Sequence, residues 1–377
     1  MTARADVYGK YSLGSGAILS DPNQVWSTLA DPQIVAEYEI SMRRDLAKSG
    51  IPISSLSDWD VMDVGTGRQA LAFLSMGARH VVHHDISVEN VARIEAHIRE
   101  AALSGRLETR CCDIVEIDLG RERFDFVYLN GIVQHFSDVG RGLTNCMKAL
   151  RRKGYLWLYF YRSGTFDNFV LYMLRTMATG SNVVTNDALM RDYYAAARLF
   201  FSDEGRDNYL TSIFMDGVFT RQARLYTVAT YLTFAKAAGF EVVSSSGLDP
   251  LGRDVDHHFA RAATVVTLRK NSSVADADIQ RAAELLAPEA EVDQLDAALY
   301  DDPDILHSLA LYRKLEAALA APGVPSAARM LVVLRLFAFL AQKTRAPGYD
   351  VMRRHADLQT VLSTIIDLVG VEYGTPP

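Results

Sequence analysis

The stretch from Asp58 to Ser87 constrains the fold of this chain more than any other, because it reads as strand, glycine turn, helix and strand. One short apolar run, formed by Val61, Met62 and Val64, ends in Gly65-Thr66-Gly67, and a second, residues 81–82, leads to Asp85. Glycines let the backbone reverse tightly enough for a ligand to lie against it. The helix after such a turn presents free N–H groups to an anion, and an acidic residue about 20 positions on can bind ribose hydroxyls. The pattern predicts a nucleoside-binding βαβ unit.

The composition is that of an ordinary globular chain, and it argues against several partners. A net charge of −7 over 377 residues disfavours nucleic acid, whose phosphates demand a basic face. Cys111, Cys112 and Cys146 lack metal-ligand spacing, which favours a reducing compartment. The apolar run from Met330 to Ala341 is interrupted by Arg335 and is too short to span a bilayer. We therefore expect a cytoplasmic protein that binds neither nucleic acid nor membrane.

The chain after Ser87 alternates predicted helices with predicted strands. The helices are expected at 87–102 and 138–151, and the strands at 107–114, 124–129 and 154–161. Alternation at this spacing is typical of a mostly parallel, doubly wound α/β sheet, which binds ligands at the carboxyl ends of its strands. The residues at the predicted strand ends are Gly67, Asp85, Asp113 and Asn130. We expect these four to meet at one edge of the sheet.

From about Trp59 to Lys270 the chain resembles the class I S-adenosylmethionine-dependent methyltransferases. The resemblance rests on DVGTG at 63–67, Asp85, CDI at 112–114, FDFVYLNGIVQHF at 124–136, and AAGF followed by EVVSSS at 237–246. It implies a Rossmann-like, mixed seven-stranded sheet whose last strand, 263–270, is antiparallel to its neighbours.

The same resemblance implies S-adenosylmethionine as the cofactor. Its glycine motif would lie at the amino-acid end of the cofactor, its Asp85 at the ribose, and residues 112–114 around the adenine. The predicted cofactor-binding residues are Asp63, Gly65, Thr66, Gly67, Arg68, Asp85, Ile86, Cys112, Asp113, Ile114, Asn130 and Gly131.

The glycine motif departs from the family pattern at its third glycine, where this chain has Gln69 after Arg68. Arg68 is predicted either to pair with the methionine carboxylate, a charge-assisted contact worth about 1.5–3 kcal/mol, or to be a surface arginine at a helix start. Read as G-x-G-x-x-A with Ala70, the motif also fits a dinucleotide fingerprint. That alternative leaves Asp113 and Asn130 without a role.

A nucleoside-binding core domain is expected at 59–270, with a leader of residues 1–58 before it. This leader is predicted to be a helical lid that places Tyr8, Tyr11 and Trp26 over the ligand. Aromatic faces would stabilise a sulfonium by about 1–2 kcal/mol. The alternative is that these aromatic residues only cover one side of the core.

Two more segments are predicted to be helical additions. The insertion 162–226 is rich in aromatic residues, Tyr172 among them, and is expected to form a substrate pocket or lid, or a small subdomain with its own core. Residues 271–377 show helical apolar spacing interrupted by prolines, and we expect them to cover the sheet edge or support a homodimer.

Three residues near the expected sheet edge are candidates for catalysis. They are Asn130 after the fourth strand, His135 shortly after it, and Tyr161 at the end of the fifth strand. His135 is expected either to act as a base or to have a packing role. The histidines of HVVHH at 80–84 are not expected to bind a metal, because no cysteine at ligand spacing accompanies them and strand alternation separates neighbours.

The predicted activity is transfer of a methyl group from S-adenosylmethionine to a small molecule, a displacement that depends on positioning and desolvation. The alternative enzyme attacks the aminocarboxypropyl chain of the cofactor itself and releases methylthioadenosine. It would close a ring amino acid such as azetidine-2-carboxylate or 1-aminocyclopropane-1-carboxylate, or transfer that chain. A third hypothesis is a binding protein that senses the cofactor without turnover. Fold alone does not choose among the three.

Overall fold

The computed structural model describes residues 32–65, 67–100, 103, 105–180, 224–246, 263–271, 274–287, 293–324, 326–345 and 351–373. The chain forms two compact units, the first made of residues 1–163 and 222–292 and the second of residues 164–221 and 293–377. This division differs from the predicted one. Residues 271–292 belong with the sheet, while the insertion and the C-terminal helices share the second unit.

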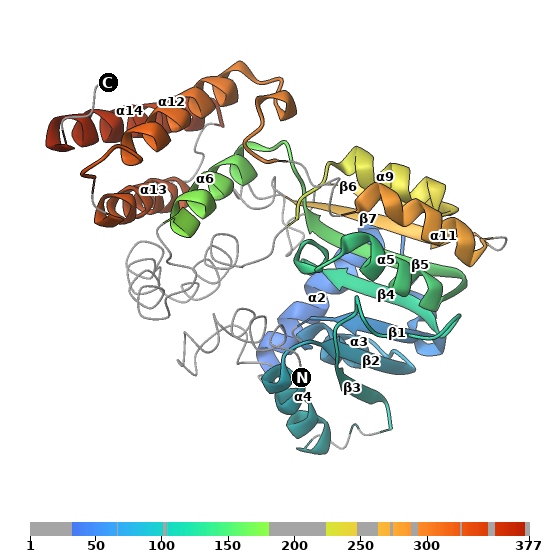
Figure 1. Cartoon of the computed structure of the whole chain (residues 1–377). Coiled ribbons are helices and arrows are strands. Elements are labelled where there is room, and N and C mark those ends of the chain that lie inside the picture. Colours follow the sequence, from blue (N-terminus) through green and yellow to red (C-terminus); the bar gives the residue numbers. More distant parts are fainter. Residues whose placement is uncertain are drawn as a thin grey trace. The chain divides into compact units, whose positions relative to one another are not determined.

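A seven-stranded sheet forms the centre of the first unit, with the order β3-β2-β1-β4-β5-β7-β6 (Figure 1). Its strands are β1 (Asp60–Val64), β2 (His80–Asp85), β3 (Leu107–Cys111), β4 (Phe124–Asn130), β5 (Leu150–Tyr161), β6 (Phe240–Ser246) and β7 (Ala263–Lys270). The first five strands run parallel, and β7 is antiparallel to both β5 and β6. The predicted Rossmann-like mixed sheet is thereby confirmed.

Two strand boundaries differ from the prediction for local reasons. β3 ends at Cys111 because the Asp113 carboxylate accepts a hydrogen bond from the Val115 N–H at 2.9 Å and starts a turn. β5 begins at Leu150 rather than 154, because Leu150 already pairs with Phe124 of β4 before a register shift.

Helices cover both faces of this sheet, and each face has its own apolar core (Figure 1). On one face lie α2 (Pro32–Lys48), α3 (Arg68–Ser75) and α4 (Val88–Glu100). On the other lie α5 (Val139–Ala149), α9 (Val228–Ala237), α11 (Asp276–Ala282) and the 3-10 helix η5 (Ala283–Leu286). Ile279, Ala282 and Leu286 are buried in this second core, which explains why residues 271–292 belong with the sheet.

The described part of the second unit is helical, as the apolar spacing predicts. Its elements are α6 (Phe166–Gly180), the 3-10 helix η7 (Ala297–Leu299), α12 (Pro303–Leu319), α13 (Ser326–Arg345) and α14 (Val351–Tyr373). α12 begins where the Asp302 carboxylate accepts from the Asp304 N–H at 2.9 Å, with Pro303 at the first helical position. Helix α12 packs against α14, and α13 packs against α6. Among the described residues, no helix has both the length and the apolar character needed to cross a membrane.

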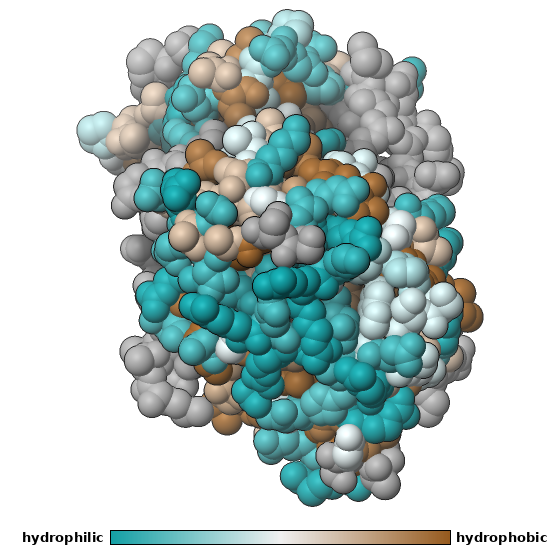
Figure 2. Space-filling view, turned by 90° about the vertical axis from the view of Figure 1, so that its right-hand side faces the viewer, coloured by the Kyte–Doolittle hydropathy of each residue, from teal (hydrophilic) through white to brown (hydrophobic). Residues whose placement is uncertain are grey.

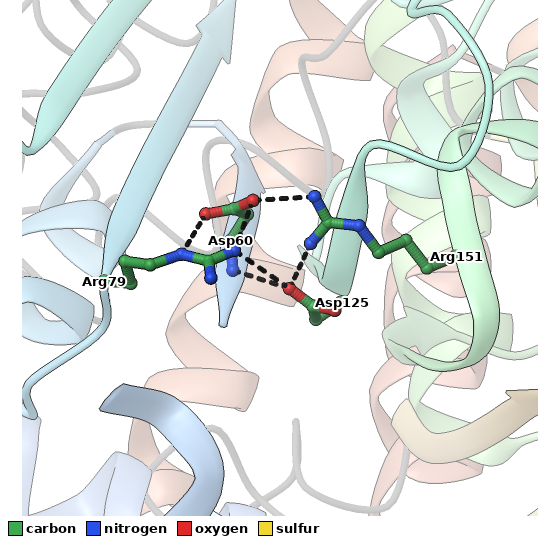
Figure 3. A network of polar contacts seen from close by, with 4 residues as sticks. All are labelled: Asp60, Arg79, Asp125 and Arg151. Atoms are coloured by element: carbon green, nitrogen blue, oxygen red, sulfur yellow. Dashed lines mark hydrogen bonds and ion pairs between the residues drawn. The ribbon is translucent and has the colours of Figure 1, made fainter. Parts of the chain in front are cut away.

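Four charged residues tie the amino ends of the parallel strands together (Figure 3). Asp60 of β1 accepts from Nε of Arg79 at 2.8 Å and from Nη2 of Arg151, on β5, at 2.8 Å. Asp125 of β4 accepts from the Asp60 N–H at 2.9 Å and also from Arg151.

Hydrophilic residues gather across the middle of the face of the molecule in Figure 2.

This amino-edge network lowers the pKa of Asp60. Burial alone would raise it, but hydrogen bonds from Arg79 and Arg151 outweigh that effect. A carboxyl group whose pKa falls on folding stabilises the folded state above its ordinary pKa, and this stabilisation is lost as the pH falls through the lowered value. Asp60 therefore contributes at neutral pH and not in strong acid.

We expect Asp60→Asn to lower the free energy of unfolding by about 1–2 kcal/mol at pH 7, because two charge-assisted hydrogen bonds are weakened. The difference from wild type should begin to shrink below about pH 4 and should approach zero only in strong acid, once the pH has fallen through the lowered pKa of Asp60 and the folded wild-type carboxyl group is also protonated. Urea denaturation at pH 7 and in strong acid measures this. Glu122→Gln is the control, since Glu122 pairs with Arg152 at an exposed site and should change stability by less than about 0.5 kcal/mol. Equal losses in the two variants would contradict the role of the network.

Candidate functional site

The glycine turn after β1 has a backbone that only glycine adopts easily. Gly65 has φ +131° and Gly67 has φ +85°. A methyl group built on Gly65 would meet no atom of the described residues within 4 Å, whereas one on Gly67 would lie 2.6 Å from Cδ1 of Ile94. The left-handed φ of Gly67 and the close approach of Ile94 both favour glycine at this position, and Gly65 leaves open space against which a ligand can lie. Thr66, predicted between them, falls outside the described residues.

The start of α3 carries Arg68 and Gln69, and Gln69 occupies the position at which the motif departs from the pattern it resembles. Gly67 is the N-cap and offers no side chain, so nothing from the cap itself bonds the N–H groups of the first turn. Arg68 and Gln69 are both buried, with 4% and 6% of their surface exposed. The interpretation of Arg68 as a surface arginine is therefore wrong. Its contact with a cofactor carboxylate stays a prediction.

Asp85 ends β2 with its carboxylate buried and held in place. Oδ1 accepts from the Ser87 N–H and Oδ2 from Nδ2 of Asn90, both at 2.8 Å. Burial, which outweighs these hydrogen bonds, raises the pKa of Asp85 to about 6. Each oxygen keeps a further lone pair, so the group can still accept from two hydroxyls. Asn90 was not among the predicted site residues, although the spacing of Ser87 and Asn90 directly after Asp85 was a signal for it.

The loop after β3 is fixed beside Asp85. The Cys112 N–H donates to the Asp85 carbonyl at 2.9 Å, while Asp113 caps its own turn. Burial raises the pKa of the Cys112 thiol to about 12, which leaves it uncharged at neutral pH. Ile114 is buried in the core on the α5 side, whereas Ile86 and Cys112 stay partly exposed.

The end of β4 and the loop that follows it carry two catalytic candidates, Asn130 and His135. Asn130 ends the strand, and the Gly131 N–H donates to the Tyr159 carbonyl at 2.8 Å. Nε2 of Gln134 donates to the Gly131 carbonyl at 2.6 Å and lies 3.2 Å from Nε2 of His135. His135, at the end of the 3-10 helix η3 (Val133–His135), is 9% exposed. Gln134 was not predicted, yet it links the loop backbone to the candidate base.

Tyr161, the third catalytic candidate, is the last residue of β5 and pairs with Ala263 of β7. Its ring lies 6.1 Å from that of Tyr159 in a T-shaped contact. The candidates Tyr8, Tyr11 and Trp26 lie outside the described residues. Tyr172 lies on α6 in the second unit. Within the described ranges, no three His, Cys, Asp or Glu residues are grouped as a metal would require.

The chemistry available at this edge is that of binding rather than of a preformed nucleophile. Open space over Gly65, the N–H groups at the start of α3 and the carboxylate of Asp85 follow one another along adjacent strand ends. N–H groups suit an anion and a carboxylate suits hydroxyls, so the edge can hold a ligand that carries both.

The comparisons with known proteins agree on the domain type. A family described as "Methyltransferase domain" matches residues 62–158. The ubiquinone biosynthesis O-methyltransferase of Bradyrhizobium sp. (strain ORS 278) is 31% identical over 173 residues, or 43% of this chain and 66% of the relative. Its namesake in Rhodopseudomonas palustris (strain HaA2) is 33% identical over 122 residues, or 30% of this chain and 47% of the relative. The chain thus spans less than two thirds of the length of either relative.

Among solved structures, the chain is similar to 1,6-didemethyltoxoflavin-N1-methyltransferase of Burkholderia thailandensis. That crystal structure contains 1,6-didemethyltoxoflavin and S-adenosylhomocysteine. Sequence identity is 17% and the TM-score is 0.40, with 72% of this chain and 92% of that chain covered.

We expect Asp85→Asn to raise the free energy of unfolding of the ligand-free protein by roughly 1–3 kcal/mol at pH 8. The raised pKa of Asp85 means that its charge opposes folding above pH 6, and the amide removes that charge. The gain should vanish below about pH 4, where the carboxyl group is protonated in both folded and unfolded states. Thermal unfolding at pH 4, 6 and 8 follows this difference.

Asp118→Asn is the matched control for this variant. Asp118 accepts from the Gly120 N–H at 2.9 Å, the same local contact that Asp85 makes with Ser87, but at an exposed site. It should give no gain at pH 8. A loss of stability in Asp85→Asn at pH 8 would contradict the prediction.

Proposed function

We propose that this chain belongs to the class I S-adenosylmethionine-dependent methyltransferase family. On this premise, we propose that it transfers the methyl group of S-adenosylmethionine to an oxygen atom of a small molecule. The observation that carries the proposal is the assembly of Gly65, Asp85, Asp113 and Asn130 along one edge of the sheet, at the ends of four adjacent parallel strands.

The residues of this edge fit the parts of S-adenosylmethionine. The positive φ of Gly65 and the open space over it accommodate the amino-acid end of the cofactor, and the N–H groups at the start of α3 suit its carboxylate. Asp85 has a spare lone pair on each oxygen for the ribose hydroxyls. The uncharged Cys112 and the partly exposed Ile86 offer an apolar surface for the adenine ring.

S-adenosylmethionine supplies a methyl group on a positively charged sulfur. The task left to the protein is to align the acceptor and exclude water. Asn130 and Gly131 stand at the carboxyl end of β4, the central neighbour of β1, and orient groups at the reacting end. His135 is the candidate to take the proton of an acceptor hydroxyl, with Gln134 holding its ring.

The choice of an oxygen acceptor rests on the relatives, which are named ubiquinone biosynthesis O-methyltransferases. The substrate itself is a proposal, because the similarity covers at most 66% of those relatives. Neither the family nor these relatives support attack on the aminocarboxypropyl chain. We also propose that the protein acts without nucleic acid or membrane as a partner, and as a homodimer if the second unit self-associates.

The test is to incubate the full chain with S-adenosylmethionine labelled in its methyl group and a panel of phenols and catechols, and to follow the products by mass spectrometry. We expect S-adenosylhomocysteine together with a labelled methyl ether. Methylthioadenosine formed without any acceptor would overturn the proposal in favour of the alternative enzyme. Failure to bind S-adenosylhomocysteine in calorimetry would overturn the cofactor assignment as well.

Two variants separate binding from turnover. Asp85→Ala should weaken S-adenosylhomocysteine binding at least tenfold, about 1.4 kcal/mol, because it removes the acceptors for the ribose. Asn130→Ala should lower kcat more than it weakens cofactor binding, since Asn130 stands at the reacting end. Equal losses of kcat and affinity in Asn130→Ala would restrict this residue to binding.

A further inference from the structure

A buried pair of side chains lies directly beneath the glycine turn. Asp63 of β1 and His83 of β2 are register partners, and His83 Nδ1 lies 3.0 Å from Oδ2 of Asp63. Both side chains are buried, with 1% and 0% of their surface exposed. Two polar side chains this deep in a core are costly unless their hydrogen bonds are complete.

The hydrogen bonds of this pair are not complete. Nε2, the second ring nitrogen of His83, is buried and has no hydrogen-bond partner among the residues that the structure describes. A methyl group built on Gly67 would lie 3.2 Å from this atom, so the ring edge faces the backbone of the turn. A buried polar atom left unpaired costs about 1–3 kcal/mol, and such an atom calls for an explanation.

The chemistry of the ring defines what Nε2 can accept. When Nδ1–H donates to the Asp63 carboxylate and the ring carries no second proton, its remaining lone pair is on Nε2. Gly67, whose built methyl group lies 3.2 Å from Nε2, is the N-cap of α3, and the N–H groups of the first turn of this helix have no partners within the helix. A small rearrangement of the turn would aim one of these at Nε2.

We propose that His83 is a positioning residue for the cofactor, whose ring, fixed by Asp63, accepts a hydrogen bond from the backbone of the glycine turn when the amino-acid end of the cofactor docks on it. The pair then sets the conformation of the turn at Gly65 and Gly67. This inference rests on the proposed function, because it assigns a further residue to the same cofactor site.

The test compares three variants of the full chain by calorimetry with S-adenosylhomocysteine and by steady-state kinetics. His83→Ala should weaken binding and raise KM for S-adenosylmethionine at least tenfold, with kcat changed less than threefold, because the reacting end is untouched. His83→Gln should recover at least half of the lost binding free energy, since its amide can donate to Asp63 and accept from the turn. If binding in His83→Ala stays within twofold of wild type, the inference is overturned.

His84→Ala is the matched control. His84 is the next residue of β2 and is equally buried, but strand alternation points its side chain to the opposite face of the sheet. Its loss should lower stability without altering KM for S-adenosylmethionine. If His84→Ala weakens binding as much as His83→Ala does, the effect of His83 is merely structural and the inference is overturned.

Nitrogen NMR of the wild-type protein tests the same inference without any variant. Adding S-adenosylhomocysteine to histidine-labelled protein should shift the Nε2 resonance of His83 toward that of a hydrogen-bonded acceptor and leave the resonances of His84 in place. An unchanged His83 resonance in protein that binds the ligand overturns the inference. Wild-type protein that fails to bind S-adenosylhomocysteine overturns the proposed function instead, so the two failures are distinguishable.

Discussion

Three backbone hydrogen bonds, one beyond the end of each of β1, β3 and β4, hold the candidate site together. The Gly65 N–H donates to the His84 carbonyl, the Cys112 N–H to the Asp85 carbonyl, and the Gly131 N–H to the Tyr159 carbonyl. Each bond extends the parallel ladder by one step into a loop, so the loops after β1, β3 and β4 are each fixed to a neighbouring strand end. The functional side chains depend on this register, because their positions follow from it.

The same residue type behaves in opposite ways at the two edges of the sheet. At the amino edge Asp60 is bonded by two arginines, which hold its pKa below the ordinary value. At the carboxyl edge the hydrogen bonds that the structure describes at the Asp85 carboxylate come from neutral donors, and burial outweighs these bonds and the nearby His83 and raises the pKa of Asp85 to about 6. Asp60 therefore stabilises the folded chain at neutral pH, whereas Asp85 opposes it. Asp85 keeps a charge that its hydrogen bonds do not fully compensate, so the binding site lowers the stability of the folded chain in favour of affinity for a ligand. The network around Asp60 at the opposite edge of the sheet offsets part of this loss of stability.

Sequence patterns predicted those parts of the site that are local in the chain. Gly65, Asp85 and Asn130 each follow a short apolar run, so strand ends and their chemistry were visible without coordinates. The contact between Asp63 and His83 was not visible, because it depends on the register of two strands 20 residues apart in the chain. The burial of Arg68 and the grouping of 271–292 with the sheet depend likewise on long-range packing, which neither periodicity nor propensity specifies.

Two features of the glycine turn lie where long-range packing decides the outcome. Gln69 stands where the resemblance described above leads us to expect a glycine and is buried beside Arg68 at the start of α3, and the ring of His83 lies beneath Gly67 on the neighbouring strand. A motif with one glycine fewer has less backbone freedom, and a rigid ring beneath it restricts that freedom further. Both features restrict the same few residues, which are the ones we propose to meet the cofactor. Preorganising such a turn reduces the conformational entropy that ligand binding must overcome.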